Sequence, residues 1–206
     1  ISYLLGMDNG KNIQSVGMEI DTAAFQQGFQ DGLTDAEPQL SEEEIAEAIQ
    51  AFETQMTAKR DEMQQAQEQE ASMQAESNLA AGTAFLAENG AKEDVITTAS
   101  GLQYKMLVEG TGATPTAEST VEVHYAGRLL DNTEFDSSVK RGVPAQFGVT
   151  QVIAGWTEAL QLMPEGSKWE LYIPADLAYG PGGTGPIGPN ATLIFEVELL
   201  QANVES

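Results

Sequence analysis

Apolar residues in the first part of the chain recur at the spacing of amphipathic helices. This pattern predicts one helix over Tyr3–Val16, which Gly17 would end in the left-handed conformation. A second helix is expected to start near Asp21, a favourable N-cap residue. Its apolar positions recur every four residues and are Phe25, Phe29 and Leu33. Helices this short cannot bury their apolar faces against each other alone.

Two pairs of glycines lie inside these helices, each pair one turn apart. They are Gly6 with Gly10, and Gly28 with Gly32. A glycine inside a helix costs about 1 kcal/mol relative to alanine, and close approach of a second helix would offset that cost. Frayed helix ends are the alternative interpretation. We therefore expect residues 1–40 to be a helical dimerisation region that a second copy of the chain covers.

A further apolar stripe follows Pro38 and predicts a longer helix. Ser41 and Glu44 form a capping box at its start. The stripe steps by four, three and four residues through Ile45, Ile49, Phe52 and Met56. Beyond Ala66 the sequence is rich in alanine, glutamine and glutamate and has almost nothing to bury. Residues 41–94 are expected to form a connecting helical arm with a solvated second half, and a disordered tether is the alternative.

The pattern becomes strand-like after about residue 95. Apolar runs bounded by turn residues are typical of strands. They predict strands over Leu102–Val108, Thr120–Leu130, Trp169–Ile173 and Thr192–Leu200. One short helix is expected between them, over Thr157–Leu162. The fold class is therefore α+β, with a domain over residues 95–206 behind the helical region and the arm.

The net charge narrows the range of partners. The chain of 206 residues has 32 acidic and 9 basic residues, which gives a net charge of −23. Such a chain repels phosphate, so nucleic acids and anionic membrane surfaces are poor candidates. No stretch approaches the roughly 20 apolar residues of a membrane span. The sequence begins at Ile1 rather than Met, and a processed or truncated N-terminus is expected.

Conventional catalytic constellations are missing from the sequence. It has no cysteine, and His124 is its only histidine, so Cys–His nucleophiles and zinc clusters are excluded. His124 alternates with apolar residues on a predicted strand and is interpreted as structural. Asp131, Glu134 and Asp136 could supply a carboxylate pair only if the turn brought them together. The glycine-rich run 180–185 lacks the lysine of a phosphate-binding loop.

Several short motifs in the second half occur in the order found in one family. They are Val123–Gly127, Phe135–Ser138, Gln151–Trp156, Leu177–Gly180 and Ala191–Phe195. Together they resemble the signatures of FKBP domains over about residues 100–201. The preceding helices, with Pro38–Glu43, and the stretches Gly155–Pro164 and Gly185–Asn190 resemble the bacterial macrophage-infectivity-potentiator subgroup. Members of that subgroup are V-shaped homodimers of the cell envelope, joined through N-terminal helices.

The resemblance implies an antiparallel sheet half-wrapped around a short helix, with the site between them. It assigns catalytic positions to Tyr125, Phe135, Asp136 and Tyr179. It assigns substrate-binding positions to Phe147, Val152, Ile153, Trp156, Ile187, Phe195 and Arg141. Trp156 would form the floor, the Tyr179 hydroxyl and the Ile153 N–H would hold substrate carbonyls, and Arg141 would pair with Asp136. Ala145 stands where many eukaryotic members carry an aromatic residue, so the rim should be more open.

The same resemblance implies a peptidyl-prolyl cis-trans isomerase. Rotation about an X–Pro bond has a barrier of about 20 kcal/mol, and an apolar site can lower it with no metal or cofactor. The expected partners are proline-containing unfolded or partly folded proteins, macrolides such as rapamycin, and a second copy of the chain. The periplasm or cell envelope, including the outer membrane, is expected in preference to the cytoplasm. The alternative function is a dimeric holdase chaperone with incidental isomerase activity.

Overall fold

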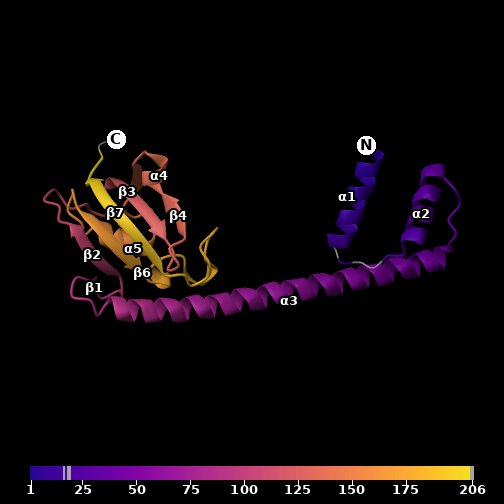
Figure 1. The fold of residues 1–206 in the computed structure, drawn as a ribbon, viewed down its shortest axis with the longest axis horizontal. Coiled ribbons are helices and arrows are strands. Elements are labelled where there is room, and N and C mark those ends of the chain that lie inside the picture. The colour runs from indigo at the N-terminus through magenta and orange to yellow at the C-terminus, as the bar shows by residue number, and fades with distance from the viewer. Residues whose placement is uncertain (16, 18–19, 205–206) are drawn as a thin grey trace. The chain divides into compact units, whose positions relative to one another are not determined.

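The computed structural model describes residues 1–15, 17 and 20–204, and these form two compact units (Figure 1). The first unit comprises Ile1–Glu62 and the second Met63–Ser206. Three helices come first in the chain: α1 (Ser2–Ser15), α2 (Thr22–Thr34) and α3 (Glu42–Asn89). Helix α3 runs through both units, so its first turns belong to one and its last turns to the other.

The predicted helix-capping residues of the first unit have the expected conformations or contacts. The predicted end of the first helix at Val16 lies outside the described residues, whereas Gly17 has the expected left-handed backbone, with φ at 68°. The Asp21 carboxylate accepts hydrogen bonds from the backbone N–H groups of Ala23 and Ala24, at 2.8 and 3.2 Å, and caps α2. None of the described residues of α1 or α2 is buried.

Helix α3 begins with the predicted capping box. The Ser41 N–H donates to the Glu44 carboxylate at 2.8 Å, and the Glu44 N–H donates to the Ser41 hydroxyl at 3.3 Å. The helix then continues for 48 residues, so the predicted helix rather than the disordered tether is confirmed. Residues 41–81 contain no glycine or proline, and the helix continues beyond them through Gly82 to Asn89.

The expectation that the second half of this helix has nothing to bury is wrong for its last turns. Phe85 packs against Tyr172 with ring centroids 5.8 Å apart. It belongs to a small apolar cluster whose other members are Leu86, Val95, Leu130, Tyr172 and Ile194. Buried Asn89 donates to Gln103 Oε1 at 3.0 Å. The end of α3 is therefore packed on the sheet of the second unit.

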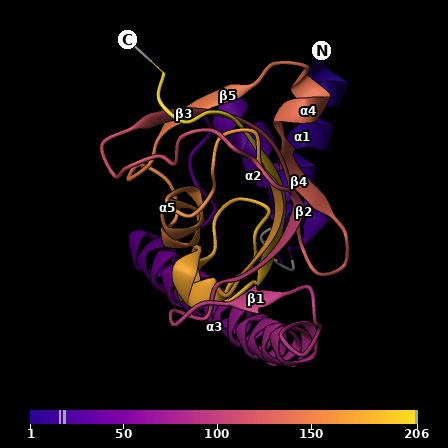
Figure 2. The same cartoon turned by 90° about the vertical axis from the view of Figure 1, so that its left-hand side faces the viewer.

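The second unit is a curved antiparallel sheet in the strand order β1-β2-β6-β7-β3-β4, with β5 also paired to β3. Its strands are β1 (Ile96–Thr97), β2 (Gln103–Val108), β3 (Thr120–Arg128), β4 (Glu134–Ser137), β5 (Ala145–Gly148), β6 (Lys168–Ile173) and β7 (Leu193–Gln201). The strands curve around helix α5 (Ala154–Leu160), which lies against the inner face of the sheet (Figure 2). Short helical segments occur at α4 (Ser138–Arg141), η1 (Ala175–Leu177) and η2 (Gly180–Gly182).

The four predicted strands are present with ends shifted by one or two residues, whereas the shorter elements are not predicted. Helix α5 begins at Ala154 instead of Thr157, because the Ile153 carbonyl accepts hydrogen bonds from Trp156 and Thr157 N–H groups at 2.9 and 3.0 Å. Strands β1, β4 and β5 span only two to four residues, too few for a periodicity to appear.

The core lies between the inner face of the sheet and α5. On β3 the residues alternate in burial, so that Val121, Val123 and Tyr125 face the core. Buried residues of β6, β7 and α5 complete one continuous apolar cluster with them. None of the helices within residues 1–15 and 20–204 is long and apolar enough to cross a membrane.

Candidate active site

A cavity of about 620 Å³ opens between the sheet, the start of α5 and the loop before β7. Every site residue predicted from the sequence lines it except Arg141, and these residues are Tyr125, Phe135, Asp136, Phe147, Val152, Ile153, Trp156, Tyr179, Ile187 and Phe195. Four further residues, Gln151, Thr184, Gly185 and Pro186, also line the cavity and were not predicted as site residues. The structure thus brings together residues that are spread over 70 positions of the sequence.

Aromatic rings form the inner end of the cavity around Trp156. The edges and faces of Tyr125, Phe147 and Phe195 meet the indole at centroid distances of 5.3, 5.8 and 5.2 Å, with interplanar angles between 81° and 89°. Phe135 adds a T-shaped contact to Phe195 at 5.5 Å. Trp156 is only 4% exposed. Such edge-to-face packing holds the rings rigidly and leaves an apolar surface.

A glycine allows two of these rings to approach the sheet. Gly127 lies on β3, and a Cβ atom placed there would stand 2.6 Å from a ring atom of Phe195 and 2.7 Å from ring atoms of Phe135. Any larger residue would push both rings away from their positions. The glycine in the Val123–Gly127 motif is therefore required by the packing of the cavity wall.

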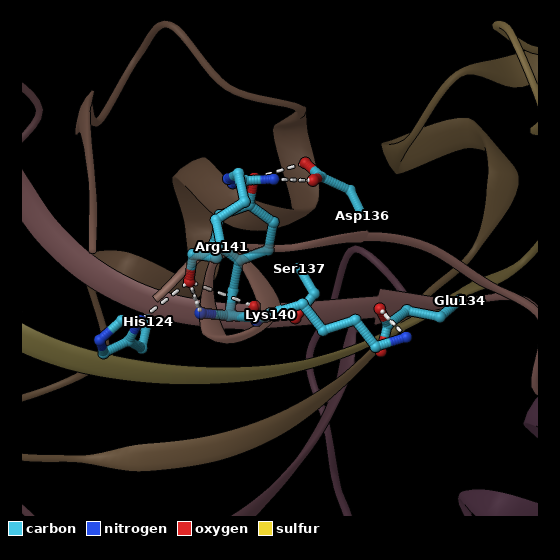
Figure 3. A network of polar contacts seen from close by, with 8 residues as sticks. His124, Glu134, Asp136, Ser137, Lys140 and Arg141 are labelled. Atoms are coloured by element: carbon cyan, nitrogen blue, oxygen red, sulfur yellow. Dashed lines mark hydrogen bonds and ion pairs between the residues drawn. The ribbon is translucent and has the colours of Figure 1, made fainter. Parts of the chain in front are cut away.

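The Asp136 carboxylate at the cavity belongs to a network of polar contacts (Figure 3). The Tyr125 hydroxyl donates to Asp136 Oδ2 at 2.5 Å, and the Arg141 guanidinium donates to the other oxygen of the same carboxylate. Arg141 Nη2 also donates to the Tyr125 hydroxyl oxygen at 2.9 Å. Arg141 thus binds two lining residues from outside the cavity, as a partner of Asp136 and not as part of the lining.

The backbone explains how these three side chains meet. Strand β4 pairs with β3 so that Asp136 lies opposite Gly127, two residues after Tyr125. The next residue, Ser137, accepts a hydrogen bond from the Lys140 N–H at 3.2 Å and caps the single turn of α4. That turn places Arg141 beside Asp136 only five residues further along the chain.

The pKa values of Asp136 and Tyr125 are shifted in opposite directions in this network. Burial opposes the charge of Asp136, but hydrogen bonds from Tyr125 and Arg141 and the charge of Arg141 outweigh it, so its pKa lies below the ordinary value. Burial, and then the hydrogen bond to the Asp136 carboxylate, raise the pKa of Tyr125. At neutral pH the site therefore presents a carboxylate and a neutral phenol.

His124 does not line the cavity. Its Nδ1 lies 3.0 Å from the hydroxyl of buried Ser138, which itself accepts a hydrogen bond from the Tyr125 N–H at 2.8 Å. This placement agrees with the structural interpretation of the lone histidine.

The three carboxylates of the turn do not converge. Asp131 Oδ1 accepts a hydrogen bond from the Thr133 N–H at 2.9 Å, and Glu134 pairs with Lys140 at 2.8 Å. Only Asp136 reaches the cavity, so the residues of this turn do not form the carboxylate pair of a glycosidase. In the described part of the chain, no three histidine, aspartate or glutamate side chains are close enough to hold a metal ion.

Tyr179 and Ile187 lie on opposite sides of a glycine-rich loop. Tyr179 precedes η2, lines the cavity and is 41% exposed. Ile187 is 5% exposed and is held in a tight turn, because Thr184 and Ile187 exchange two backbone hydrogen bonds of 2.8 Å. This turn also brings Thr184, Gly185 and Pro186 to the cavity.

Two family models match consecutive parts of the chain. The family model described as "FKBP-type peptidyl-prolyl cis-trans isomerase" matches residues 112–200. The one described as "Domain amino terminal to FKBP-type peptidyl-prolyl isomerase" matches residues 1–106. Both halves of the chain therefore match regions that occur together in one family.

Individual relatives match over nearly the full length. The outer membrane protein MIP of Legionella longbeachae is 48% identical over 97% of this chain and 83% of its own. The peptidyl-prolyl cis-trans isomerase Mip of Coxiella burnetii is 44% identical over 97% of this chain and 84% of its own. Among solved structures, the crystal structure of FkpA from Escherichia coli is 35% identical, with a TM-score of 0.67 over 97% of this chain and 93% of that one. The chain therefore belongs to the family of FKBP-type peptidyl-prolyl cis-trans isomerases.

Proposed function

We propose that this peptidyl-prolyl cis-trans isomerase rotates the X–Pro bond inside the aromatic cavity. The observation that carries the proposal is the group of three aromatic side chains around Trp156, extended by Phe135, beside one ionised carboxylate. The planar amide owes its stability to resonance, which separates charge between oxygen and nitrogen and which water supports. A site that replaces this water by aromatic carbon favours the twisted, less polar amide relative to the planar one.

The polar groups of the cavity would orient the substrate. The Tyr179 hydroxyl and the Ile153 N–H would donate to substrate carbonyl groups, and the proposal is supported by the position of both residues in the cavity lining, with Ile153 directly before α5. Asp136 would act on the proline ring side through the electrostatic field of a fixed carboxylate, with Arg141 and Tyr125 holding its position. The reaction in this scheme is non-covalent.

The test uses the full chain and a short X–Pro peptide. Exchange spectroscopy should show faster cis-trans interconversion in the presence of the protein, and rapamycin should suppress the acceleration. The variant Tyr179→Phe keeps the ring but removes the hydroxyl, and should lower kcat/KM about fivefold. Interconversion at the rate of buffer alone, with a native near-ultraviolet spectrum, would rule the assignment out.

The proposed substrates are proline-containing unfolded or partly folded proteins in the periplasm or cell envelope. The name of the Legionella longbeachae relative, an outer membrane protein, supports that location. The strongly acidic chain, with a net charge of −23, would remain soluble among such clients without attracting nucleic acids.

We also propose that two copies pair through α1 and α2. These helices expose large apolar side chains, among them Phe29 at 58% and Leu33 at 73%. A Cβ atom at any of the glycines of α1 and α2 would meet no heavy atom of the described chain within 4 Å, so the glycines are not explained by packing within one copy. A groove lined by Gly28, Gly32 and Ile45 offers about 500 Å³ for a partner helix.

A dimeric holdase chaperone activity is the second candidate function, and exposed apolar side chains of α3 outside the proposed pairing surface, such as Met63 at 53% and Met73 at 65%, support it. The two activities can be distinguished by the protein substrate that is used in the assay. A chaperone that only holds unfolded chains would suppress aggregation of a protein without prolines, whereas the isomerase would accelerate refolding only where an X–Pro bond limits the rate.

A further inference from the structure

The loop Gly183–Asn190 has hollow space on both of its sides. Pro186 and Ile187 line the aromatic cavity on one side. On the other side a second cavity of about 400 Å³ is lined by Pro186 and Gly188 together with Gln74 and Asn78 of helix α3. Because Pro186 borders both cavities, close packing alone does not fix the position of the loop.

The internal hydrogen bonds of the loop set its shape. The Thr184 and Ile187 backbones donate to each other's carbonyl groups at 2.8 Å, and the Asn190 N–H donates to the Gly180 carbonyl at 2.8 Å. These bonds close the loop on itself. They do not determine where the closed loop stands relative to the aromatic wall.

Two side-chain hydrogen bonds in the described chain link the loop to helix α3. Asn78 Nδ2 donates to the Pro189 carbonyl at 2.8 Å, and Asn190 Nδ2 reaches the Ala75 carbonyl at a longer 3.4 Å. The Asn78 amide is oriented for this task, because Gln74 Nε2 donates to its oxygen at 2.8 Å. The shorter bond, from Asn78, is therefore the main link.

The helix reaches the loop because it approaches the sheet closely one turn later. Gly82 is buried, and a Cβ atom placed there would stand 2.2 Å from Thr192 Oγ1, directly after the loop. Asn78 lies four residues before Gly82 and so projects from the same side of the helix. The contact of Asn78 with the loop is thus part of the same close packing of helix α3 that Gly82 allows.

We propose that Asn78 is a positioning residue for the reaction: through the Pro189 carbonyl it holds Pro186 and Ile187 over the bound proline-containing peptide. The proposal rests on the function proposed above. It assigns to helix α3, which precedes the catalytic domain in the sequence, a direct part in shaping the substrate cavity. Without the bond, the loop would drift toward the second cavity and the peptide would lose one wall of its site.

The test compares Asn78→Asp and Asn78→Ala in the full chain. The aspartate has the same shape but places an oxygen against the Pro189 carbonyl, and the alanine removes the donor without adding charge. Gln67→Glu, on an exposed position of the same helix, is the control for an amide-to-acid change. Both Asn78 variants should raise KM for an X–Pro peptide about fivefold with a smaller change in kcat, whereas Gln67→Glu should match the parent protein.

Amide hydrogen exchange supplies a readout that a merely structural role would not move. In both Asn78 variants the Ile187 and Asn190 amides should exchange about tenfold faster, while amides of β3 and β7 keep their protection. A KM within twofold of the parent value, or unchanged exchange at Ile187, would overturn the proposal. A parent protein without isomerase activity would instead refute the proposed function, and exchange at Ile187 would still decide whether Asn78 holds the loop.

Discussion

Asp136 is an ionised residue of the site whose pKa depends on neighbours from several elements. Tyr125 comes from β3, Asp136 from β4 and Arg141 from α4, and they meet through hydrogen bonds to a single carboxylate. The Asp136 side chain remains 43% exposed, so the ion pair with Arg141 contributes little to global stability. The ion pair instead holds the negative charge of Asp136 and the phenol of Tyr125 at the edge of the cavity.

Replacing Asp136 should therefore reduce catalysis more than stability. Asp136→Ala is expected to lower kcat/KM for an X–Pro peptide about tenfold, with a midpoint of urea unfolding close to that of the parent protein. His124→Gln is the matched control, since His124 lies outside the cavity and contacts Ser138. Loss of activity in a folded His124→Gln variant would show that the histidine takes part in the reaction.

The two pKa shifts predict a broad pH plateau. The pKa of Asp136 in the folded protein lies below the ordinary value of about 3.9. The ionised carboxylate is therefore present above that value, and it is lost as the pH falls through the lower folded-state pKa. The pKa of Tyr125 in the folded protein lies above the ordinary value of about 10. The neutral phenol that donates to Asp136 is therefore present below about 10, and it is lost as the pH rises through the higher folded-state pKa. Profiles of kcat/KM should be flat from about pH 5 to about pH 9, and a break within this range would contradict the network.

The sequence motifs locate the aromatic residues of the cavity well, and they locate the loop less well. Tyr125, Trp156 and Phe195 belong to motifs whose spacing follows from strands and a helix. Thr184, Gly185 and Pro186 reach the cavity only because a turn closed by Ile187 folds them back. Turn residues show where a chain bends but not toward which cavity, so this part of the site could not be predicted.

At the scale of elements, helix α3 shows the limit of reading apolar stripes. Its last turns pack on the sheet and on the loop before β7 through the apolar side chains of Phe85 and Leu86. They also pack through Asn78, Gly82 and Asn89, which are polar or without a side chain. An apolar periodicity cannot reveal such contacts, because amide groups and a glycine carry the same pattern as a solvated surface. The contacts of Asn78, Gly82 and Asn89 are therefore visible only in the structure, as hydrogen bonds and as the close approach at Gly82.

This close approach predicts an unusual response to a helix-favouring substitution. In an open helix, Gly82→Ala would stabilise by about 1 kcal/mol. Here the new methyl group would stand 2.2 Å from Thr192 Oγ1, so the variant should lose about 1 to 3 kcal/mol of unfolding free energy. Adding Thr192→Ala should recover part of the loss, as measured by urea denaturation. An increase in stability on Gly82→Ala alone would show that the helix is not packed this closely.

At the scale of the whole molecule, the first unit exposes apolar side chains that the proposed pairing of two copies would cover. None of the described residues of α1 or α2 is buried, although α2 places Phe25 and Phe29 side by side with stacked rings. An isolated chain would leave these surfaces in water. The proposed pairing of two copies would bury these apolar surfaces, with the same surface of each copy facing the other.

Deletion of residues 1–40 should yield monomers. Sedimentation of the deletion variant and of Gly28→Leu, which fills the groove beside α2, should show a smaller species than the parent protein. Both should keep activity on a short X–Pro peptide but lose efficiency on a protein whose refolding is limited by proline, because two sites no longer flank one client. A deletion variant that still sediments as a dimer would contradict the pairing through α1 and α2.

The second cavity behind Pro186 has a consequence for inhibitor selectivity. A compound that fills the aromatic cavity alone meets only residues between Tyr125 and Phe195, all of which follow helix α3 in the sequence. One that extends past Pro186 would also touch Gln74 and Asn78, which belong to helix α3. An FKBP domain without such a helix has no wall at that place. Chemical series grown from the aromatic cavity toward α3 should therefore gain affinity for this protein and lose it for single-domain FKBPs.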